Sequence, residues 1–390
     1  MKNQRQRRGA IIVLAAICMV IVAAILAFTV DLGLLLSART EMQRSADSAA
    51  LAGAWKFVDD NTLRGNTAAV DRAARQTAAQ FAAMNQVVQT RPFLNTDTDV
   101  RLGYLGDPSN HNEKISFSNP GKYNTVEVTV EYSAQKNTPI SFFFAPIIGI
   151  KASDLSVTAA ATFDSSNTIG FRVPKGAGEC TLMPFTVKHE DWNALLNGAG
   201  EDNWTYDPKT GTVSAGPDGI PEMRMFPEKD SGNGKKDKQS GTGITPGNFG
   251  TVDIGNPNNS TKDLRSQILY GPSPEDMSYF KNNELKLDPT SGTLDLNGDT
   301  GISAGMKLAL PDIVGKPKSI TLYREAVGQG NNTWFTIDGF AGVRVMDFTM
   351  TGKDKYIIIQ PAVVVDPTAI SGDDNDNTSS NIGPPVRLVR

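Results

Sequence analysis

Residues 9–30 of this 390-residue chain read GAIIVLAAICMVIVAAILAFTV and contain no charged side chain. At about 1.5 Å of rise per residue, a helix over these positions is roughly 33 Å long, which exceeds the roughly 30 Å hydrocarbon core of a bilayer. Because the bilayer core offers no water to backbone polar groups, an apolar run of this length favours a helix, whose hydrogen bonds are internal. The stretch therefore predicts a transmembrane helix over residues 9–30.

The two flanks of this run differ in charge. Four basic residues precede it, namely Lys2, Arg5, Arg7 and Arg8. The opposite flank opens with Asp31. Basic residues beside a span favour its cytoplasmic side. The sequence therefore predicts a cytoplasmic basic tail over residues 1–8, a single pass through the cytoplasmic (inner) membrane, and an extracytoplasmic location for the bulk of the chain.

A cleaved secretory signal is the alternative interpretation of this N-terminus. The apolar run is longer than the roughly 7–15-residue core of such a signal. A cut after Ala27 would place Ile25 at the third position back, where a small residue is preferred. A lipoprotein signal is disfavoured because Ile17, which is not small, precedes Cys18. We therefore favour an uncleaved anchor.

Composition limits the classes of partner and the number of domains. The net charge is −4, and beyond residue 8 the acidic and basic residues are interspersed, so we expect no nucleic-acid partner. The two cysteines are Cys18, inside the predicted span, and Cys180, so the soluble parts have no internal disulfide. A chain of 390 residues is long for one domain and predicts two domains outside the membrane.

Residues 31–58 are expected to continue the helix as a neck outside the membrane. Residues at heptad a/d spacing, most of them small, form one seam along it: Leu35, Ala38, Met42, Ser45, Ala49 and Ala52. Small residues let another helix approach closely. The seam is expected either to pack on the chain's own extracytoplasmic domain or to meet identical or related helices in an assembly.

Residues 59–165 predict a small α+β domain. We expect a helix from Asn66 to about Gln86 and half-buried strands over 126–132 and 155–163, where apolar and polar residues alternate. The connection between the two strands, PISFFFAPIIG over residues 139–149, is strongly apolar. We expect it in the core; a contact with a partner or a membrane surface is the alternative, since exposed apolar patches mark interaction sites.

Residues 171–370 predict a second, β-rich domain. Its strands are expected over 319–327, 334–338, 342–350 and 356–365, and Pro361 breaks the last of these or places it at a sheet edge. A Gly- and Asn-rich stretch over 230–250 predicts a long mobile loop, and the polar residues 371–390 predict a disordered tail. The fold class is therefore α+β, with one N-terminal transmembrane helix, a helical neck, a small α+β domain and a β-rich extracytoplasmic domain.

An ordered set of features in residues 7–54 points to a family. Arg8-Gly9 precedes the span, Asp31-Leu32-Gly33 closes it, and the following helix ends in ADSAALAGA at residues 46–54. This set resembles the N-terminal module of the TadE/TadG-like proteins of tight-adherence (Flp-type) pilus assembly. The segment PISFFFAPIIGI and the Ala-rich strand after it are more loosely similar to the region that follows in such proteins.

The resemblance implies a membrane-anchored structural or accessory component of pilus assembly. Its implied partners are the lipid bilayer and other pilus-assembly or pilin-like membrane proteins, met through the neck helix. Pilin-like members that are processed carry a Glu five residues after the Gly, and Leu14 stands at that position here, which favours the uncleaved, G-like branch. An envelope hydrolase or carbohydrate-binding module on a pilin-like anchor is the alternative function.

Two motifs imitate sites of larger proteins. Some members of the G-like branch bear a von Willebrand A domain, and Asp164–Thr168 (DSSNT) is similar to its D-x-S-x-S metal motif, with Thr at the last position. The sequence that follows lacks the alternation of strands and helices which that fold needs. Gly301–Gly305 (GISAG) matches a nucleophile elbow, but His111 and His189 both precede it, whereas the hydrolase order places His later. We expect a turn there.

Two further groups of polar residues lack a complete set of ligands. Asp295–Asp299 (DLNGD) resembles the start of a calcium loop, but Thr300 and Met306 stand where Gly and Glu are required. An Asx-rich turn is expected there, with a structural calcium as the alternative.

The second group is Cys180 with His189-Glu190-Asp191, which is too small for a zinc site and weak for a thiol enzyme. We expect a buried Cys and a surface His, with Trp192 and Trp204 in the core. The sequence thus predicts no enzyme, no catalytic, cofactor-binding or metal-ligating residue, and no cofactor.

Overall fold

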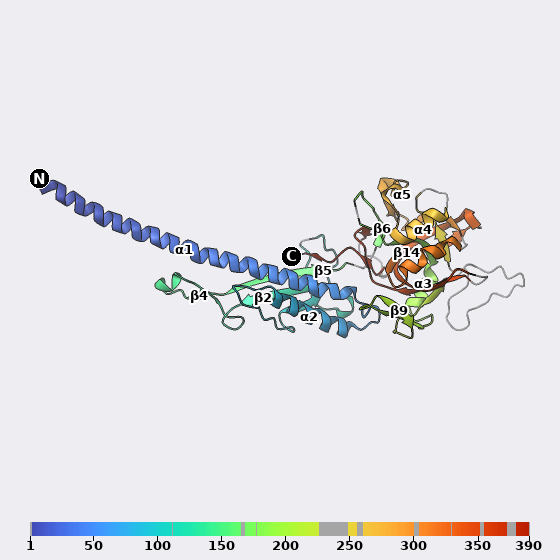
Figure 1. Cartoon of the computed structure of the whole chain (residues 1–390), viewed down its shortest axis with the longest axis horizontal. Coiled ribbons are helices and arrows are strands. Elements are labelled where there is room, and N and C mark those ends of the chain that lie inside the picture. The colour runs from blue at the N-terminus through green and yellow to red at the C-terminus, as the bar shows by residue number, and fades with distance from the viewer. Residues whose placement is uncertain are drawn as a thin grey trace, which may run out of the picture.

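The computed structural model describes residues 2–110, 112–164, 168–176, 178–225, 249–255, 260–299, 304–328, 330–351, 355–372 and 380–389. One long helix, α1 (Lys2–Ala54), leads into two bodies of mixed structure (Figure 1). We call them the N-terminal module, residues 31–164 with 384–389, and the C-terminal module, residues 168–383. Helices and several separate sheets together confirm the α+β class.

Helix α1 runs without interruption through both the predicted span and the predicted neck. The first proline of the chain is Pro92, so no residue of the helix lacks a backbone donor. A short 3-10 helix, η1 (Trp55–Val58), follows directly. Between Ile11 and Val30 every large apolar side chain is 49–69 % exposed. The N-terminal half of α1 is therefore bare, while its C-terminal half lies against the protein.

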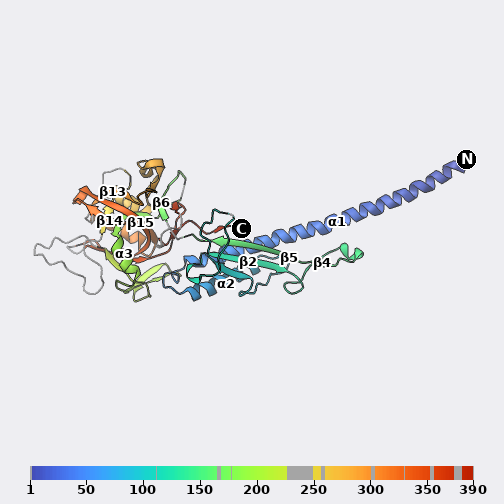
Figure 2. The ribbon, with the colours of Figure 1, turned by 180° about the vertical axis from the view of Figure 1, so that it is seen from behind.

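The N-terminal module packs α1 and a second helix on one sheet. Four antiparallel strands follow in the order β1 (Val100–Gly103), β2 (Thr125–Tyr132), β5 (Leu155–Thr162) and β20 (Arg387–Leu388). Helix α2 (Thr67–Met84) begins after Asn66, whose side chain accepts a hydrogen bond from the Ala69 N–H. Figure 2 shows α2, β2 and β5 beside the C-terminal half of α1. The predicted second helix and both predicted strands are confirmed.

The core of this module consists largely of alanine. The fully buried alanines of its main apolar cluster come from α1, α2 and β5: Ala38, Ala46, Ala49, Ala50, Ala54, Ala74, Ala78, Ala82, Ala159 and Ala161. Met42 and Ser45 are also fully buried, and the Ser45 hydroxyl donates to the Ala82 carbonyl of α2 at 3.2 Å. The neck seam thus packs on the chain's own module, which is the first of the two arrangements expected for it.

The apolar connection between β2 and β5 is not core. It forms a hairpin of β3 (Ile140–Ser141) and β4 (Ala152–Ser153), whose tip holds the 3-10 helix η3 (Ala145–Ile148). Ile140 is buried, but Phe143 and Ile147 are 72 % and 84 % exposed. The hairpin extends away from the sheet along α1, so these apolar side chains lie outside the core (Figure 1).

The C-terminal module is built around one large sheet that closes on itself. Its strands follow in the order β10 (Met223–Met225), β16 (Tyr356–Pro361), β15 (Thr333–Thr349), β13 (Leu294–Asp299), β11 (Phe249–Val252), β7 (Leu182–Lys188) and β14 (Pro317–Val327). Because β14 also pairs with β15, the five strands from β15 to β14 form a ring. The strands predicted over 334–338 and 342–350 are one continuous strand, β15.

The C-terminal module also contains shorter strands and helices. They are β6 (Thr168–Phe171), α3 (His189–Leu196), β8 (Trp204–Asp207), β9 (Thr212–Ala215), α4 (Thr261–Tyr270), α5 (Pro274–Met277), β12 (Leu285–Lys286), β17 (Val364–Val365), β18 (Ala369–Ser371) and β19 (Ile382–Gly383), with the 3-10 helices η4 (Lys281–Asn283), η5 (Ala304–Leu308), η6 (Leu310–Ile313) and η7 (Gly330–Asn332). A further 3-10 helix, η2 (Pro120–Lys122), belongs to the N-terminal module. Two apolar clusters flank the strands; the first is rich in Met, Leu and Ile, and the second in Phe, Leu, Ile and Val.

The end of the chain returns to the N-terminal module. Strand β19 pairs with β17, and β20 then pairs with β5 at the edge of the first sheet. The predicted disordered tail is therefore wrong for residues 380–389, because Val386 and Val389 pack against apolar clusters of the N-terminal module. Residues 373–379 of that tail lie outside the described residues, as does the predicted mobile loop up to residue 248. The C-terminal module is thus inserted between β5 and β20.

Candidate functional site

The bare half of α1 is the first functional surface. Within the described part of the chain, α1 is the one helix long and apolar enough to cross a membrane, with a mean hydropathy of 3.3 over its most apolar window. None of that window is buried inside the protein. Exposed large apolar side chains on every face of a helix are what a lipid environment requires and what water disfavours.

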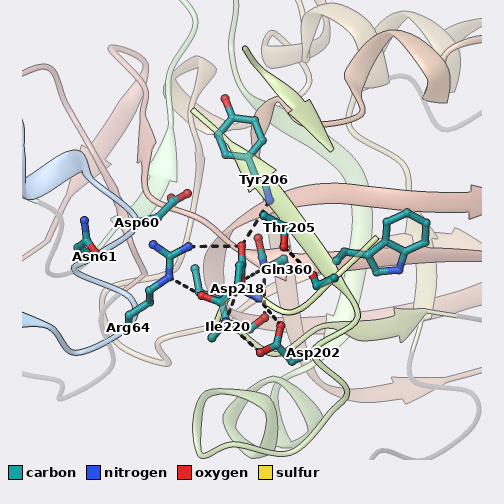
Figure 3. A network of polar contacts seen from close by, with 12 residues as sticks. Asp60, Asn61, Arg64, Asp202, Thr205, Tyr206, Asp218, Ile220 and Gln360 are labelled. Atoms are coloured by element: carbon teal, nitrogen blue, oxygen red, sulfur yellow. Dashed lines mark hydrogen bonds and ion pairs between the residues drawn. The ribbon is translucent and has the colours of Figure 1, made fainter. Parts of the chain in front are cut away.

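The junction between the two modules is the second functional surface, and Figure 3 shows its part around Arg64 and Asp218. Arg344 on β15 contacts Asp60 in the turn after η1, with Nη1 to Oδ2 at 3.2 Å and Nη2 to Oδ1 at 3.4 Å. Its Nε donates to the Gly315 carbonyl at 3.0 Å, and its guanidinium lies 3.7 Å from the ring centroid of Tyr206. Both charged side chains are almost fully buried, so this pair is fixed in one geometry.

A second ion pair lies next to the first. In this pair the arginine belongs to the N-terminal module and the acid to the C-terminal module. Arg64 of the N-terminal module donates from Nε to the Asp218 carbonyl at 2.6 Å, and its Nη2 lies 3.4 Å from Asp218 Oδ2. Asp218 Oδ1 accepts from Gln360 on β16, and Asp202 accepts from the Asp218 and Gly219 N–H groups. Each module therefore supplies one acid and one arginine, which fixes the register of the contact.

Beside this network stands a carboxyl group with a perturbed pKa. Glu222 is 4 % exposed and accepts the backbone N–H groups of Asn203 and Trp204 at 2.8 and 3.1 Å. Burial, with a further contribution from the nearby Asp202 and Asp218 carboxylates, raises the pKa of Glu222 to about 7. The protonation of this group therefore changes near neutral pH.

The structure separates Cys180 from His189. Cys180 is buried in an apolar cluster, and burial raises the pKa of its thiol to about 12, which keeps it neutral and unreactive. His189 opens α3, and its Nδ1 lies 2.9 Å from Asp338 Oδ1. The histidine is half-buried in this pair rather than a free surface residue. Trp192 is buried as expected, whereas Trp204 is only partly buried.

The calcium-like motif Asp295–Asp299 is a strand, not a turn. All five residues belong to β13 and pair with β15 and β11. Side chains two apart on a strand lie roughly 6–7 Å apart, too far for Asp295, Asn297 and Asp299 to converge on one ion. Gly298 is required here, because a Cβ would lie 2.1 Å from the Thr251 carbonyl oxygen. Among the residues that the structure describes, no cluster of three His, Cys, Asp or Glu side chains is placed to hold a metal.

Two other motifs fall partly outside the described residues. Of the elbow-like Gly301–Gly305, residues 301–303 lie outside, and Gly305 belongs to η5. Of Asp164–Thr168, residues 165–167 lie outside, and Thr168 opens β6.

A groove of roughly 470 Å³ lies on the C-terminal module and contains the His189–Asp338 pair, with Trp192, Lys286 and Asp288 in its lining. Asp288 accepts the Thr290 and Ser291 N–H groups, and these bonds lower the pKa of its carboxyl. A general acid needs a raised pKa, so Asp288 is unsuited to that role in glycoside hydrolysis. A second groove, of roughly 620 Å³, lies on the N-terminal module beside α2.

Sequence reasoning missed the junction. The residues that meet there are 154 and 284 positions apart, and the only local signal was the Asp-Asp-Asn that ends the first helix. Charge pairs at such separations leave no periodic pattern in a single sequence.

Comparison with known families assigns the N-terminal part. Residues 9–56 match the family model described as putative Flp pilus-assembly TadE/G-like, and residues 52–161 match the one described as putative Tad-like Flp pilus-assembly. No curated protein and no solved structure gives a significant match. The N-terminal part of the chain is therefore similar to pilus-assembly proteins. More narrowly, both matched families are Tad-type, and the first is TadE/TadG-like, as the sequence resemblance predicted.

The matched residues coincide with structural units. The first match covers the apolar part of α1, the neck and the start of η1, and the second covers α2 and the sheet as far as β5. Neither match extends into the C-terminal module. The two families support interaction with other pilus components.

Proposed function

We propose that this protein is an N-in, single-pass component of the cytoplasmic membrane that holds a large extracytoplasmic module for Flp/Tad-type pilus assembly. The observation that carries the proposal is the continuity of α1. A helix whose apolar half is bare and whose other half is clamped to a folded domain transmits the orientation of the span directly to that domain. Its partners are the lipid bilayer and other pilus-assembly membrane proteins.

The junction supports a scaffolding role for the C-terminal module. Two chain connections, after β5 and before β20, and two buried or half-buried ion pairs tie it to the N-terminal module. Such a double connection limits hinge motion, since both strands would have to bend together. The module is therefore presented as a fixed extension of the membrane anchor.

The proposal includes a structural rather than an enzymatic role, with no cofactor. Supporting it, the thiol of Cys180 is buried and neutral, and the carboxylates of the groove on the C-terminal module serve as hydrogen-bond acceptors for neighbouring groups. The pilus-assembly families themselves favour a structural component.

Topology is the direct test. A fusion of alkaline phosphatase after residue 60 should be active, and a fluorescent protein that matures only in the cytoplasm should be dark at the same position. Replacing Arg5, Arg7 and Arg8 with Glu should impair or invert insertion, because the basic flank sets orientation. A cytoplasmic signal from the unaltered fusion would refute the proposal.

A further inference from the structure

We propose that the apolar tip, residues 142–150 of the β3–β4 hairpin, inserts into the outer face of the bilayer beside α1, and that Asp31 locks it there. This inference rests on the proposed membrane anchoring of α1. It adds a second lipid-binding element, separated from the span by more than a hundred residues of sequence, and assigns a role to the charged residue that ends the span.

The side chains of the apolar tip suit lipid and not water. No charged residue occurs between Lys136 and Lys151. The exposed fractions are 72 % for Phe143, 84 % for Ile147 and 75 % for Ile148. Burying one such side chain is worth roughly 1.5–3 kcal/mol, so leaving several together in water is costly.

Backbone N–H groups of the tip form hydrogen bonds within the protein, as a medium without water requires. The Phe142 N–H donates to the Lys151 carbonyl, and those of Ile147, Gly149 and Ile150 donate to carbonyls within the tip. Pro146 has no N–H to satisfy. Irregular backbone is tolerated at membrane depth only where the protein itself satisfies its polar groups.

Asp31 accepts hydrogen bonds from three further N–H groups of the tip. Its Oδ1 accepts from Phe143 at 2.8 Å, its Oδ2 accepts from Ala145 at 2.7 Å, and the Phe144 N–H lies between them at 3.1–3.3 Å. Asp31 is only 5 % exposed and directly follows the predicted span. The carboxylate thus gains three donors where it would otherwise lose solvation, and the tip is tied to the end of the span.

The placement of the hairpin agrees with insertion. In both views the hairpin that carries β4 extends away from the sheet along α1 toward the N-terminus (Figures 1 and 2). The tip therefore lies on the membrane side of the N-terminal module and next to the lipid-facing surface of α1. Lys151 follows the tip and is exposed, where its ammonium group can meet lipid phosphates.

The test uses full-length protein in vesicles of phosphatidylethanolamine and phosphatidylglycerol. In a Cys18→Ser background, an environment-sensitive fluorophore is placed at Ile147→Cys on the tip, Val22→Cys in the span, or Thr212→Cys on β9 of the far module. Lipids carrying a nitroxide on the upper acyl chain quench probes at that depth. Protein without an introduced cysteine gives the background from the buried Cys180.

We expect quenching at Ile147→Cys and none at Thr212→Cys, with deep-chain nitroxides quenching Val22→Cys. If Val22→Cys is quenched while Ile147→Cys behaves like Thr212→Cys, the inference is overturned and the membrane anchor stands. If Val22→Cys is not quenched, the proposed function itself fails. A blue-shifted but unquenched Ile147→Cys probe would show that a protein partner, not lipid, covers the tip, and would also overturn the inference.

The role of Asp31 has its own variant. Asp31→Asn leaves one acceptor oxygen and introduces an NH₂ group opposite a backbone N–H, so the tip should detach and its quenching should fall toward the Thr212→Cys level. Asp47→Asn is the matched control in the same helix, where the carboxylate accepts from Gln43 instead. Unchanged quenching in Asp31→Asn, with Val22→Cys still quenched, would refute the lock.

Discussion

The cores of the two modules are packed with side chains of different size. The N-terminal module joins two helices and a sheet through alanines, so the backbones approach closely: a Cβ on Gly53 of α1 would lie 3.0 Å from Val126 Cγ1 on β2. The C-terminal module packs its strands with larger side chains, chiefly Leu, Ile, Val, Phe and Met. The packing of the N-terminal module depends on the small volume of its buried side chains. The packing of the C-terminal module depends on the large volume of its buried side chains. Added volume should therefore damage the first module and removed volume the second.

The largest expected effect is in the C-terminal module. Phe335 is 1 % exposed, its ring centroid lies 5.1 Å from that of Tyr323, and its ring edge occupies the space over Gly250. Phe335→Ala should cost about 3–5 kcal/mol of unfolding free energy, because a cavity remains. Amide hydrogen exchange of the full-length protein in detergent should show lost protection in β13 and β15 but not in α2 or β2. Equal losses in both modules would show that they unfold as one unit.

The junction should come next. Arg344→Met leaves the Asp60 carboxylate nearly buried without its ion pair, and removing one partner of such a pair costs about 3 kcal/mol or more. Lys188→Met is the matched control, since its pair with Glu190 is exposed and should be worth less than about 1 kcal/mol. Limited proteolysis at the junction measures both variants. Equal resistance of the two variants would contradict a structural role for the buried pair.

A pH dependence should follow from Glu222. Its pKa is about 7 in the folded protein against an ordinary 4.5, so between these values the folded state keeps a proton that the unfolded state has lost. Stability should therefore fall as pH rises from about 4.5 to 7, by at most about 3 kcal/mol, and change no further above that. Glu222→Gln should remove this slope in urea titrations at several pH values. A wild-type stability that rises across the window would contradict the raised pKa.

The smallest change concerns the alanine core. Ala49→Leu adds volume where α1 meets the rest of the module and should cost about 1–3 kcal/mol. Leu36→Ala, at a site 58 % exposed on the same helix, should change stability by less than about 0.5 kcal/mol. Hydrogen exchange in α2 and β2 reports both variants. If Ala49→Leu left exchange unchanged but abolished cross-links between copies in membranes, the seam would be an assembly surface after all.

Much of the fold was predictable because the signals were local. The uncharged run before Asp31 gives α1, the alternation around Val126 gives β2, and Asn66 begins α2 as a cap. The motifs of residues 7–54 identified the family, which the comparisons confirmed. Each of these depends on residues within one or two turns, or within one strand, of each other.

The sequence by itself determined that this chain has a lipid-compatible helix, an amphipathic neck and alternating strands, since periodicity states which face of an element is apolar. Only the tertiary structure decided what covers each face. It placed α2 and β2 on the neck seam, left Phe143 and Ile147 bare, and made Asp295–Asp299 a strand rather than a turn. It also brought Asp31 to residues 143–145 and Arg344 to Asp60. Which distant residue covers a given side chain depends on the path of the whole chain. A local sequence pattern does not contain that information.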